Sequence, residues 1–383
     1  MIVLTLNNGS SSLKFGLYRV EGSEFSALMT GETEGGALQA QDAGGSALPG
    51  TPLRADTQEA TLKAIMAHLA TSGLPAPEAI GHRIVHGGPA LRAHCLIGDD
   101  VMRNLEAACA LSPLHGSSAL TIIRLAGKAW PGVPQAACLD TVFHASMPDI
   151  ARTLPVAREL RAEGVQRYGF HGLSCESIIR QLGPDVPPRT IIAHLGSGAS
   201  VTAVRDGCSV DTSMGLTPSG GVVMATRSGD IDPGILIYLL RQQGTDAAAL
   251  EDLIDHRSGL LGVSGLSGDL RALRKAEPFD PDARLAIAMF CMSVAKAIAG
   301  MIVALGGVDA IVFTGGIGEH DAAARDAICR HLDGLNIRFD DDRDEGAVDR
   351  IEIAGSSCRR HVLPAREDDQ IALHTRDLVA AGS

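Results

Sequence analysis

Histidine, arginine and aspartate residues stand at the ends of several short apolar runs in this chain. Arg83 lies in AIGHRIVHGG at 79–88, Asp140 in CLDTVFH at 138–144 and His171 in QRYGFHG at 166–172. An arginine beside a buried strand usually pairs with a carboxylate, although its planar guanidinium equally suits a phosphoryl or carboxylate ligand. Ligands of open α/β sheets collect at strand ends. With LSPLHG at 111–116, these segments favour one shared site over isolated structural histidines.

Two Gly/Ser turns have the composition of an anion-binding hairpin. In IVLTLNNGSSSLKFGLYRV at 2–20, two apolar runs flank a turn that holds Asn7, Ser10, Ser12 and then Lys14. Such a turn offers backbone N–H groups, hydroxyls and one ammonium to an anion. An ordinary polar hairpin would look the same in isolation. TIIAHLGSGASVTAV at 190–204 repeats the pattern, which favours an internally duplicated α/β fold holding one polyphosphate from two sides.

Three further stretches have the composition of ligand loops. DTSMGLTPSGGVVMATRSGDIDP at 211–233 has no helical or strand period and surrounds a single Arg227. Long ordered loops of this kind are usually functional. A second Gly/Ser loop at 259–274 ends near Asp269 and Arg271. The apolar strand expected at 310–314 runs into GGIGEH at 315–320, an order of elements typical of nucleotide binding. Glu367-Asp368-Asp369 is an acidic cluster expected at a strand end, where it could face a metal or simply solvent.

Composition predicts a globular protein without a nucleic-acid or membrane partner. The 383 residues are 45% hydrophobic and 20% charged, which permits two domains with their own cores. The formal net charge of −12, without a basic block, argues against nucleic acid and anionic membranes. No GxxxxGK[ST] P-loop is present.

Cysteine usage and the apolar segments predict a cytoplasmic location. The eight cysteines are scattered without a CxxC pair, which is typical of reduced thiols. Met1 leads directly into a strand-like run, unlike a signal peptide. The apolar region 287–313 is interrupted by Lys296 and by Gly306-Gly307, so we expect a buried helix and a strand in place of a membrane span.

Hydrophobic spacing places the other elements coarsely. Amphipathic helices are expected at 57–72, about 119–129, 235–241 and 282–305. Residues 21–56 are rich in Gly, Ala, Ser and Thr, and we expect weak strands and mobile loops there.

Taken together, these motifs resemble those of the acetate kinase family, in the superfamily that joins acetate and sugar kinases with actin. The resemblance rests on NNGSSSLKF at 7–15, GHRIVHGG at 81–88, PLHG at 113–116, DTVFH at 140–144, YGFHG at 168–172, HLGSG at 194–198, DTSMGLTP and TRSGDIDP within 211–233, and FTGGIGE at 313–319. It implies two duplicated actin-like (ribonuclease H-like) α/β domains with an active-site cleft between them. The implied N-terminal domain covers 1–145 plus 369–383, and the nucleotide-binding and dimerisation domain covers 146–368.

The resemblance implies reversible transfer of the γ-phosphoryl group of ATP to acetate or a similar short-chain carboxylate. The products are an acyl phosphate and ADP, the cofactor is Mg²⁺ with Mn²⁺ as the alternative, and the expected assembly is a homodimer. The implied catalytic residues are Arg83, Asp140, His171 and Arg227, and the implied metal-binding residues are Asn7 and Glu367. Arg83, Val85, Leu114, Phe170 and Pro218 are implied to bind the substrate. The residues implied to bind ATP are Ser10, Ser12, Lys14, His194, Leu195, Gly196, Ser197, Gly198, Asp269, Leu270, Arg271, Gly316, Ile317, Gly318, Glu319 and His320.

Several positions depart from the usual pattern of that family. Ser197 and His320 stand where its members usually carry Asn, and Ala225 replaces a glycine. Pro218-Ser219-Gly220-Gly221 replaces PLEG, and Ala365-Arg366-Glu367-Asp368 replaces TNEE. These departures leave open the acyl chain length and the choice between ATP, GTP and pyrophosphate as donor.

Two alternatives come from other functional classes. The many histidines would suit a hydrolytic metalloenzyme, but no HExxH or comparable ligand spacing supports it. A non-catalytic nucleotide sensor on the same scaffold is the second, since fold alone does not establish activity. Retention of Arg83, Asp140, His171 and Arg227 together favours the enzyme, because a sensor needs none of these charges. Propionate and butyrate stay open as substrates.

Overall fold

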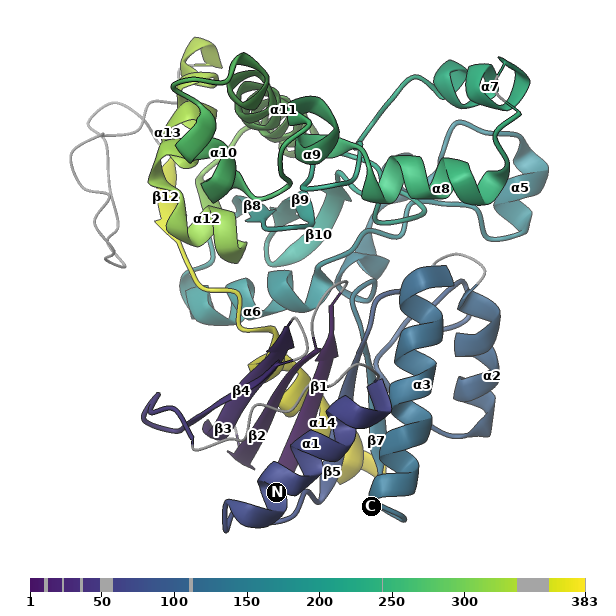
Figure 1. Ribbon diagram of the computed structural model, residues 1–383, viewed down its shortest axis with the longest axis vertical. Coiled ribbons are helices and arrows are strands. Elements are labelled where there is room, and N and C mark those ends of the chain that lie inside the picture. Colours follow the sequence, from purple (N-terminus) through teal and green to yellow (C-terminus); the bar gives the residue numbers. More distant parts are fainter. Residues whose placement is uncertain are drawn as a thin grey trace. The chain divides into compact units, whose positions relative to one another are not determined.

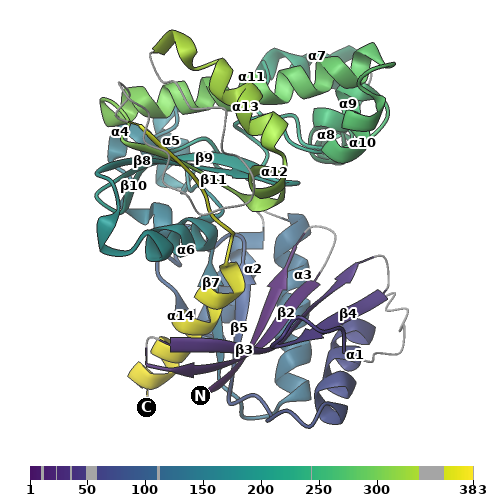
Figure 2. The same ribbon diagram turned by 90° about the vertical axis from the view of Figure 1, so that its left-hand side faces the viewer.

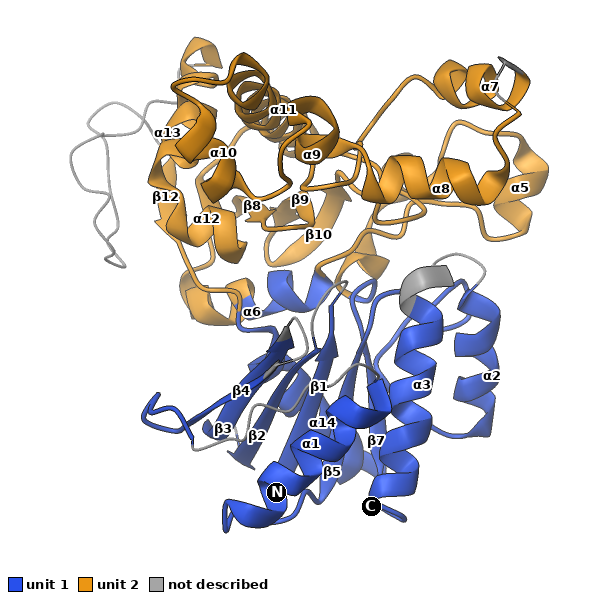
Figure 3. Ribbon diagram, in the orientation of Figure 1, with its two compact units in different colours: residues 1–142, 172–177, 366–383 blue, residues 143–171, 178–365 orange. Residues whose placement is uncertain are grey.

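The chain divides into two compact units. The structure, a computed structural model, describes residues 1–9, 13–22, 24–34, 37–48, 58–109, 113–242, 244–335 and 358–382. Unit 1 comprises 1–142, 172–177 and 366–383, and unit 2 comprises 143–171 and 178–365 (Figures 1 and 3).

Unit 1 is built on a seven-stranded sheet with the order β4-β3-β2-β1-β5-β7-β6. β1 pairs antiparallel with β2 and parallel with β5, and β5 pairs parallel with β7. The strands are β1 (Ile2–Asn8), β2 (Leu13–Glu21), β3 (Glu24–Glu34), β4 (Ala37–Asp42), β5 (Ala79–Ile84), β6 (Cys95–Leu96) and β7 (Gln135–Leu139). The expected first hairpin is therefore present.

Helices lie on both faces of this sheet. α1 (Gln58–Thr71) and α3 (Pro113–Ala129) pack on one face, and α2 (Asp99–Ala108) packs beside α3. The C-terminal helix α14 (Glu367–Gly382) contacts β1, β5 and β7, and Figure 2 shows it against the sheet.

Successive side chains of β1 and β5 point to opposite faces of the sheet, and this alternation decides which of them face α14. Leu4 and Leu6 of β1 join the core with α1 and α3, whereas Val3 joins the core with α14. A Cβ added at Gly81 of β5 would lie 2.2 Å from Thr375 Oγ1 and 2.5 Å from Ile371 Cγ2, both on α14. Because alternate side chains of a strand share a face, Asn7 and Arg83 also point to the α14 side.

Unit 2 repeats the strand arrangement. Its five-stranded sheet has the order β10-β9-β8-β11-β12, where β8 pairs antiparallel with β9 and parallel with β11. The strands are β8 (Arg189–Leu195), β9 (Ala199–Arg205), β10 (Cys208–Thr212), β11 (Ala310–Thr314) and β12 (Arg359–Val362). The sequence β3-β2-β1-β5-β7 in the first sheet corresponds to this order, so the predicted duplicated α/β fold is confirmed.

The other elements of unit 2 are helices of varied length. The α-helices are α4 (Asp149–Arg152), α5 (Arg158–Ala162), α7 (Pro233–Gln242), α8 (Ala247–His256), α9 (Gly259–Ser264), α10 (Leu270–Ala276), α11 (Pro281–Leu305), α12 (Gly315–His320) and α13 (Ala322–Arg330), with α6 (Gly172–Leu182) starting in unit 1. The 3₁₀ segments are η2 (Phe143–Ser146), η3 (Gly183–Asp185) and η4 (Asp333–Leu335).

The long helix α11 begins and ends at clear local signals. The Asp280 side chain accepts hydrogen bonds from the N–H groups of Asp282 and Ala283, and Pro281 is the first helical residue. Gly306, at φ 69°, ends the helix. By length and composition α11 could cross a membrane. However, 44% of its most apolar stretch is buried inside the protein, and the helix packs on β8, β9 and β10. The expected core helix therefore accounts for its apolar character.

Most predicted elements are present, and three differ in detail. β3 and β4 form longer regular strands than the composition of 21–56 indicates, because β3 pairs with β2 along its length. The helix expected from about 119 starts at Pro113, a residue favoured at the first helical position. The acidic cluster at 367–369 forms the first turn of α14 instead of a strand end, where it complements the helix dipole.

Candidate functional site

A buried ion pair lies where β5 and β7 of unit 1 end. Arg83 donates to Asp140 Oδ2 from Nε at 2.9 Å and from Nη2 at 2.6 Å. The Asp140 side chain is fully buried and that of Arg83 is 13% exposed. The backbone N–H of Asp140 donates to Ile84 O at 2.9 Å, which continues the pairing of β5 and β7 beyond the last strand residues. The sheet register therefore brings these two residues together.

Asn7 and Glu367 complete this group. Arg83 Nη1 lies 3.4 Å from Asn7 Oδ1, and Asn7 Nδ2 donates to Glu367 Oε2 at 3.0 Å. Arg83 Nε lies 3.9 Å from the same Glu367 oxygen. Four residues from the ends of β1, β5 and β7 and the start of α14 thus form one cluster, which we call the Arg83 cluster.

The Arg83 cluster carries more negative than positive charge. Burial, and then the charge of Glu367, raises the pKa of Asp140 against the opposing effect of Arg83. Burial opposes the charge on Arg83, but Asp140 and Glu367 outweigh it and raise its pKa. Burial and the charge of Glu367 also raise the pKa of neighbouring Asp368 to about 6. A bound cation would relieve this repulsion.

Asp140 Oδ1 and Asp368 Oδ1 are shielded from solvent and have no hydrogen-bond partner among the described residues. A buried oxygen without a partner calls for an explanation, such as a bound water, an ion or a catalytic role. Asp368 belongs to the acidic cluster that the sequence allows to face a metal, but Glu367 is the member of that cluster predicted as a metal ligand. The adjacent acidic residues after Pro364 were the available signal, but burial of Asp368 Oδ1 could not be read from them.

The residues predicted to hold phosphate in the first hairpin are only partly described. Lys14 is exposed on β2, paired in register with Asn7 of β1. Its charge acts on Asp368, whose pKa it lowers against the effect of burial. Ser10 and Ser12 lie outside the described residues, so their predicted role in phosphate binding stays a prediction.

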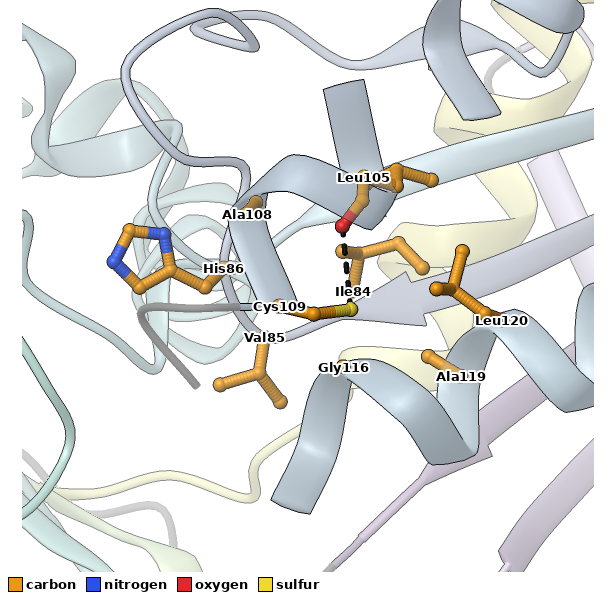
Figure 4. A pocket seen from close by; sticks show the side chains of 9 residues that line it. All are labelled: Ile84, Val85, His86, Leu105, Ala108, Cys109, Gly116, Ala119 and Leu120. Carbon is orange, nitrogen blue, oxygen red and sulfur yellow. Dashed lines mark hydrogen bonds between the residues drawn. The ribbon is translucent and has the colours of Figure 1, made fainter. Parts of the chain in front are cut away.

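Val85 lines a small cavity in unit 1 of about 10 Å³. The cavity lies among β5, α2 and α3, and Figure 4 shows Leu105, Cys109 and Leu120 grouped together while Val85 and His86 point away from them. Cys109 Sγ contacts Leu105 O at 3.3 Å. The side chain of Leu114, predicted to line the same substrate pocket, lies outside the described ones.

In unit 2, His171 has a strained backbone fixed by its neighbours. It adopts the left-handed conformation at φ 58°, which is uncommon for a non-glycine residue and is often found at functional sites. His144 Nε2 lies 2.8 Å from Phe170 O and its Nδ1 lies 2.9 Å from Ser209 Oγ. His144 and the buried Phe170 therefore hold the segment that presents His171.

The His171 side chain lies against the second hairpin. Its Nδ1 is 2.9 Å from Ser200 Oγ on β9, and its ring stacks on that of His194 with centroids 4.2 Å apart. A Cβ added at Gly198 would lie 3.3 Å from both His171 Nε2 and Arg227 Nη1. His171 and Arg227 thus converge on the turn between β8 and β9.

The loop around Arg227 is ordered by backbone hydrogen bonds. Ala225 N donates to Ser197 O at 3.2 Å, and Arg227 Nη1 donates to the carbonyl of buried Pro218 at 3.3 Å. Leu260 and Leu261 of α9 donate to the carbonyls of Met224 and Ala225. Between the end of β10 and the start of α7, the predicted functional loop therefore has a defined conformation without being a helix or a strand.

The remaining residues predicted to bind ATP fall into three groups. Gly196 and Ser197 form the β8–β9 turn, and Gly316, Ile317, Gly318, Glu319 and His320 belong to α12. The side chains of Leu195 and Leu270 are in the core, so only their backbones could contact a ligand. Asp269 caps α10 through the N–H of Arg271, and their exposed side chains pair at 3.0 Å.

Unit 1 also contains a cluster of His94, Glu176 and His374. Glu176 contacts His374 Nε2 at 2.6 Å and His94 Nε2 at 3.3 Å. These bonds outweigh the effect of burial and lower the pKa of Glu176 to about 2. The N–H of Leu139 donates to His94 Nδ1 at 3.0 Å, so a neutral His94 ring carries its proton on Nε2. His94 Nε2 then donates to Glu176, so hydrogen bonds engage both ring nitrogens of His94.

Comparison with known proteins gives one consistent result. Residues 2–373 match the model of the Acetokinase family. Acetate kinase of Rhodopseudomonas palustris is 37% identical over 397 residues, which cover 100% of this chain and 99% of that protein.

Solved structures agree with this match over nearly the whole chain. A propionate kinase from Francisella tularensis has a TM-score of 0.90 and 34% identity, covering 98% of this chain and 99% of the other. Acetate kinase of Porphyromonas gingivalis has a TM-score of 0.86 and 32% identity, covering 99% of each chain. The chain therefore belongs to the Acetokinase family.

Proposed function

We propose that this protein transfers the γ-phosphoryl group of ATP reversibly and directly to acetate, giving acetyl phosphate and ADP. The observation that carries the proposal is the Arg83 cluster, in which one guanidinium and several carboxylates are held at strand ends of unit 1. The acetate kinases among its full-length relatives support the same reaction. A neighbour described as a propionate kinase keeps propionate as the alternative substrate.

Arg83 supplies the binding group for the substrate carboxylate. Three of its five N–H donors are directed at Asp140 and Asn7, and the Asp140 pair fixes the plane of the guanidinium. A planar fork of N–H donors suits the two oxygens of a carboxylate, which the remaining donors would bind. Lysine could not replace it, because an ammonium lacks the planar fork.

The oxygen-rich donor set fits a hard divalent cation such as Mg²⁺. Asp140, Glu367 and Asn7 offer oxygens, and the orphaned Asp140 Oδ1 is the acceptor that lacks a partner. Bound there, Mg²⁺ would neutralise phosphate charge and orient the phosphates. Mn²⁺ has similar ligand preferences and is the alternative.

The residues of unit 2 supply positive charge and hydrogen bonds to the phosphoryl group. A carboxylate is already a nucleophile at neutral pH, so the reaction needs alignment and charge stabilisation and no general base. Arg227 and His171 converge on Gly198, and the backbone of the β8–β9 turn is available to phosphate oxygens. In α12, a Cβ at Gly316 would meet no atom within 4 Å, which leaves room for a nucleotide.

We also propose that the protein is a cytoplasmic homodimer. α7 exposes Ile235, Ile237, Tyr238 and Leu240, whose exposed fractions run from 43% to 58%, and a second copy would cover this apolar face. Light scattering should give twice the chain mass for the wild type and a lower mass for Ile237→Glu. A wild-type monomer at micromolar concentration would contradict the dimer.

A hydroxamate trapping assay tests the reaction itself. Hydroxylamine converts an acyl phosphate to a hydroxamate, so acetate, propionate and butyrate can each be combined with ATP, GTP and pyrophosphate in the presence of Mg²⁺. We expect the highest kcat/KM with acetate and ATP, and loss of activity on chelation of the metal. A sensor would bind ATP yet form no acyl phosphate with any pair, and that outcome would overturn the enzyme assignment.

Replacing Arg227 tests whether its positive charge stabilises the phosphoryl group. Arg227→Ala should keep the fold, because backbone hydrogen bonds hold the surrounding loop, and should lower kcat on the order of 10²–10³-fold. Arg161→Ala, which removes an exposed arginine of α5, is the matched control and should leave kcat unchanged. Near-normal turnover of Arg227→Ala would refute the proposed role.

A further inference from the structure

The side chain of Glu319 holds two segments of unit 2 together. Glu319 Oε1 accepts hydrogen bonds from Gly315 N and from Ala365 N, each at 2.9 Å. Gly315 opens α12, the glycine-rich segment, whereas Ala365 lies 46 residues after Glu319. One carboxylate oxygen therefore ties the start of α12 to a distant part of the chain.

Among the described residues, neither N–H group has another acceptor. Gly315 stands at the start of a helix, where N–H groups have no intrahelical partner, and the preceding Thr314 makes no side-chain capping bond. Ala365 follows the end of β12, after Leu363 N has donated to Phe313 O at 3.1 Å. Since unsatisfied N–H groups are costly, Glu319 fixes the position of both.

The backbone at Gly315 has little freedom to move and find another acceptor if the bond to Glu319 is lost. Gly315 has φ +77°, and a Cβ there would lie 2.8 Å from Leu195 O at the end of β8. At the other end of α12, Arg325 Nη1 donates to Gly318 O at 2.8 Å and to Glu319 O at 3.0 Å. Side chains thus hold both ends of α12. The Glu319 carboxylate accepts a backbone N–H bond at the start of the helix, and the Arg325 guanidinium donates to backbone carbonyls at its end.

We propose that Glu319 is a positioning residue, which sets the glycine-rich start of α12 for the nucleotide and anchors the segment that leads into Glu367. Its carboxylate is used as a backbone acceptor and does not contact ATP or the metal. Sequence reasoning places Glu319 among the ATP-binding residues, and the two backbone bonds give it this different task. The inference rests on the proposed kinase function, in which α12 receives ATP.

Two substitutions separate positioning from direct binding. Glu319→Gln keeps an oxygen that can accept both N–H bonds and removes the charge, whereas Glu319→Ala removes the acceptor. We expect Glu319→Gln to stay within about threefold of the wild type. Glu319→Ala should raise KM for ATP roughly 10- to 100-fold, with a much smaller change in KM for acetate, because two hydrogen bonds are lost. Glu159→Ala, on the exposed face of α5, is the control.

Hydrogen exchange gives a readout independent of activity. The amides of Gly315 and Ala365 should exchange faster in Glu319→Ala and stay protected in Glu319→Gln. If Glu319→Gln loses activity as severely as Glu319→Ala while both amides stay protected, the charge itself is used and the proposal is overturned. Unchanged KM for ATP in a folded Glu319→Ala would also overturn it. Absence of acyl phosphate in the wild type would defeat the kinase function, whereas the exchange experiment would still test the two bonds.

Discussion

The candidate site depends on the buried pair of Arg83 and Asp140. Burying a carboxylate is costly unless a partner compensates, and here one guanidinium faces Asp140 and Glu367 together, with Asp368 beside them. Burial first, and then the surplus of negative charge that Glu367 brings, keeps the pKa of Asp140 raised against the effect of Arg83. The same surplus makes the cluster suited to a divalent cation. The excess of buried carboxylates over guanidinium therefore explains both the cost of burying the cluster and its proposed ability to bind a cation.

Strand geometry explains how distant residues meet. The alternation along β1 and β5 turns Asn7 and Arg83 to the face on which α14 packs, and α14 begins with Glu367. In unit 2 the equivalent hairpin supplies Gly198, against which Arg227 lies. Each unit thus uses the same strand order for a different proposed task, carboxylate and cation binding in unit 1 and phosphate binding in unit 2.

Much of the fold was predictable because hydrophobic periodicity and glycine positions are local signals. The two hairpins, the core helix α11 and the duplication were visible in the sequence. The contacts of Glu319 and the burial of Asp368 Oδ1 were not, because they depend on tertiary packing between segments far apart in the chain. Likewise, only the structure shows that Leu195 points into the core. The residue assignments taken from the family resemblance stay predictions until they are tested on this chain.

A titration with a divalent cation tests whether the Arg83 cluster is a cation site. Mn²⁺ can be titrated into the protein and the free ion followed by electron paramagnetic resonance, with Asp140→Asn compared to the wild type and to the exposed control Asp99→Asn. We predict that Asp140→Asn weakens Mn²⁺ binding by at least about tenfold while Asp99→Asn binds as the wild type does. Equal Mn²⁺ affinity in a folded Asp140→Asn variant would contradict a cation site built on the Arg83 cluster.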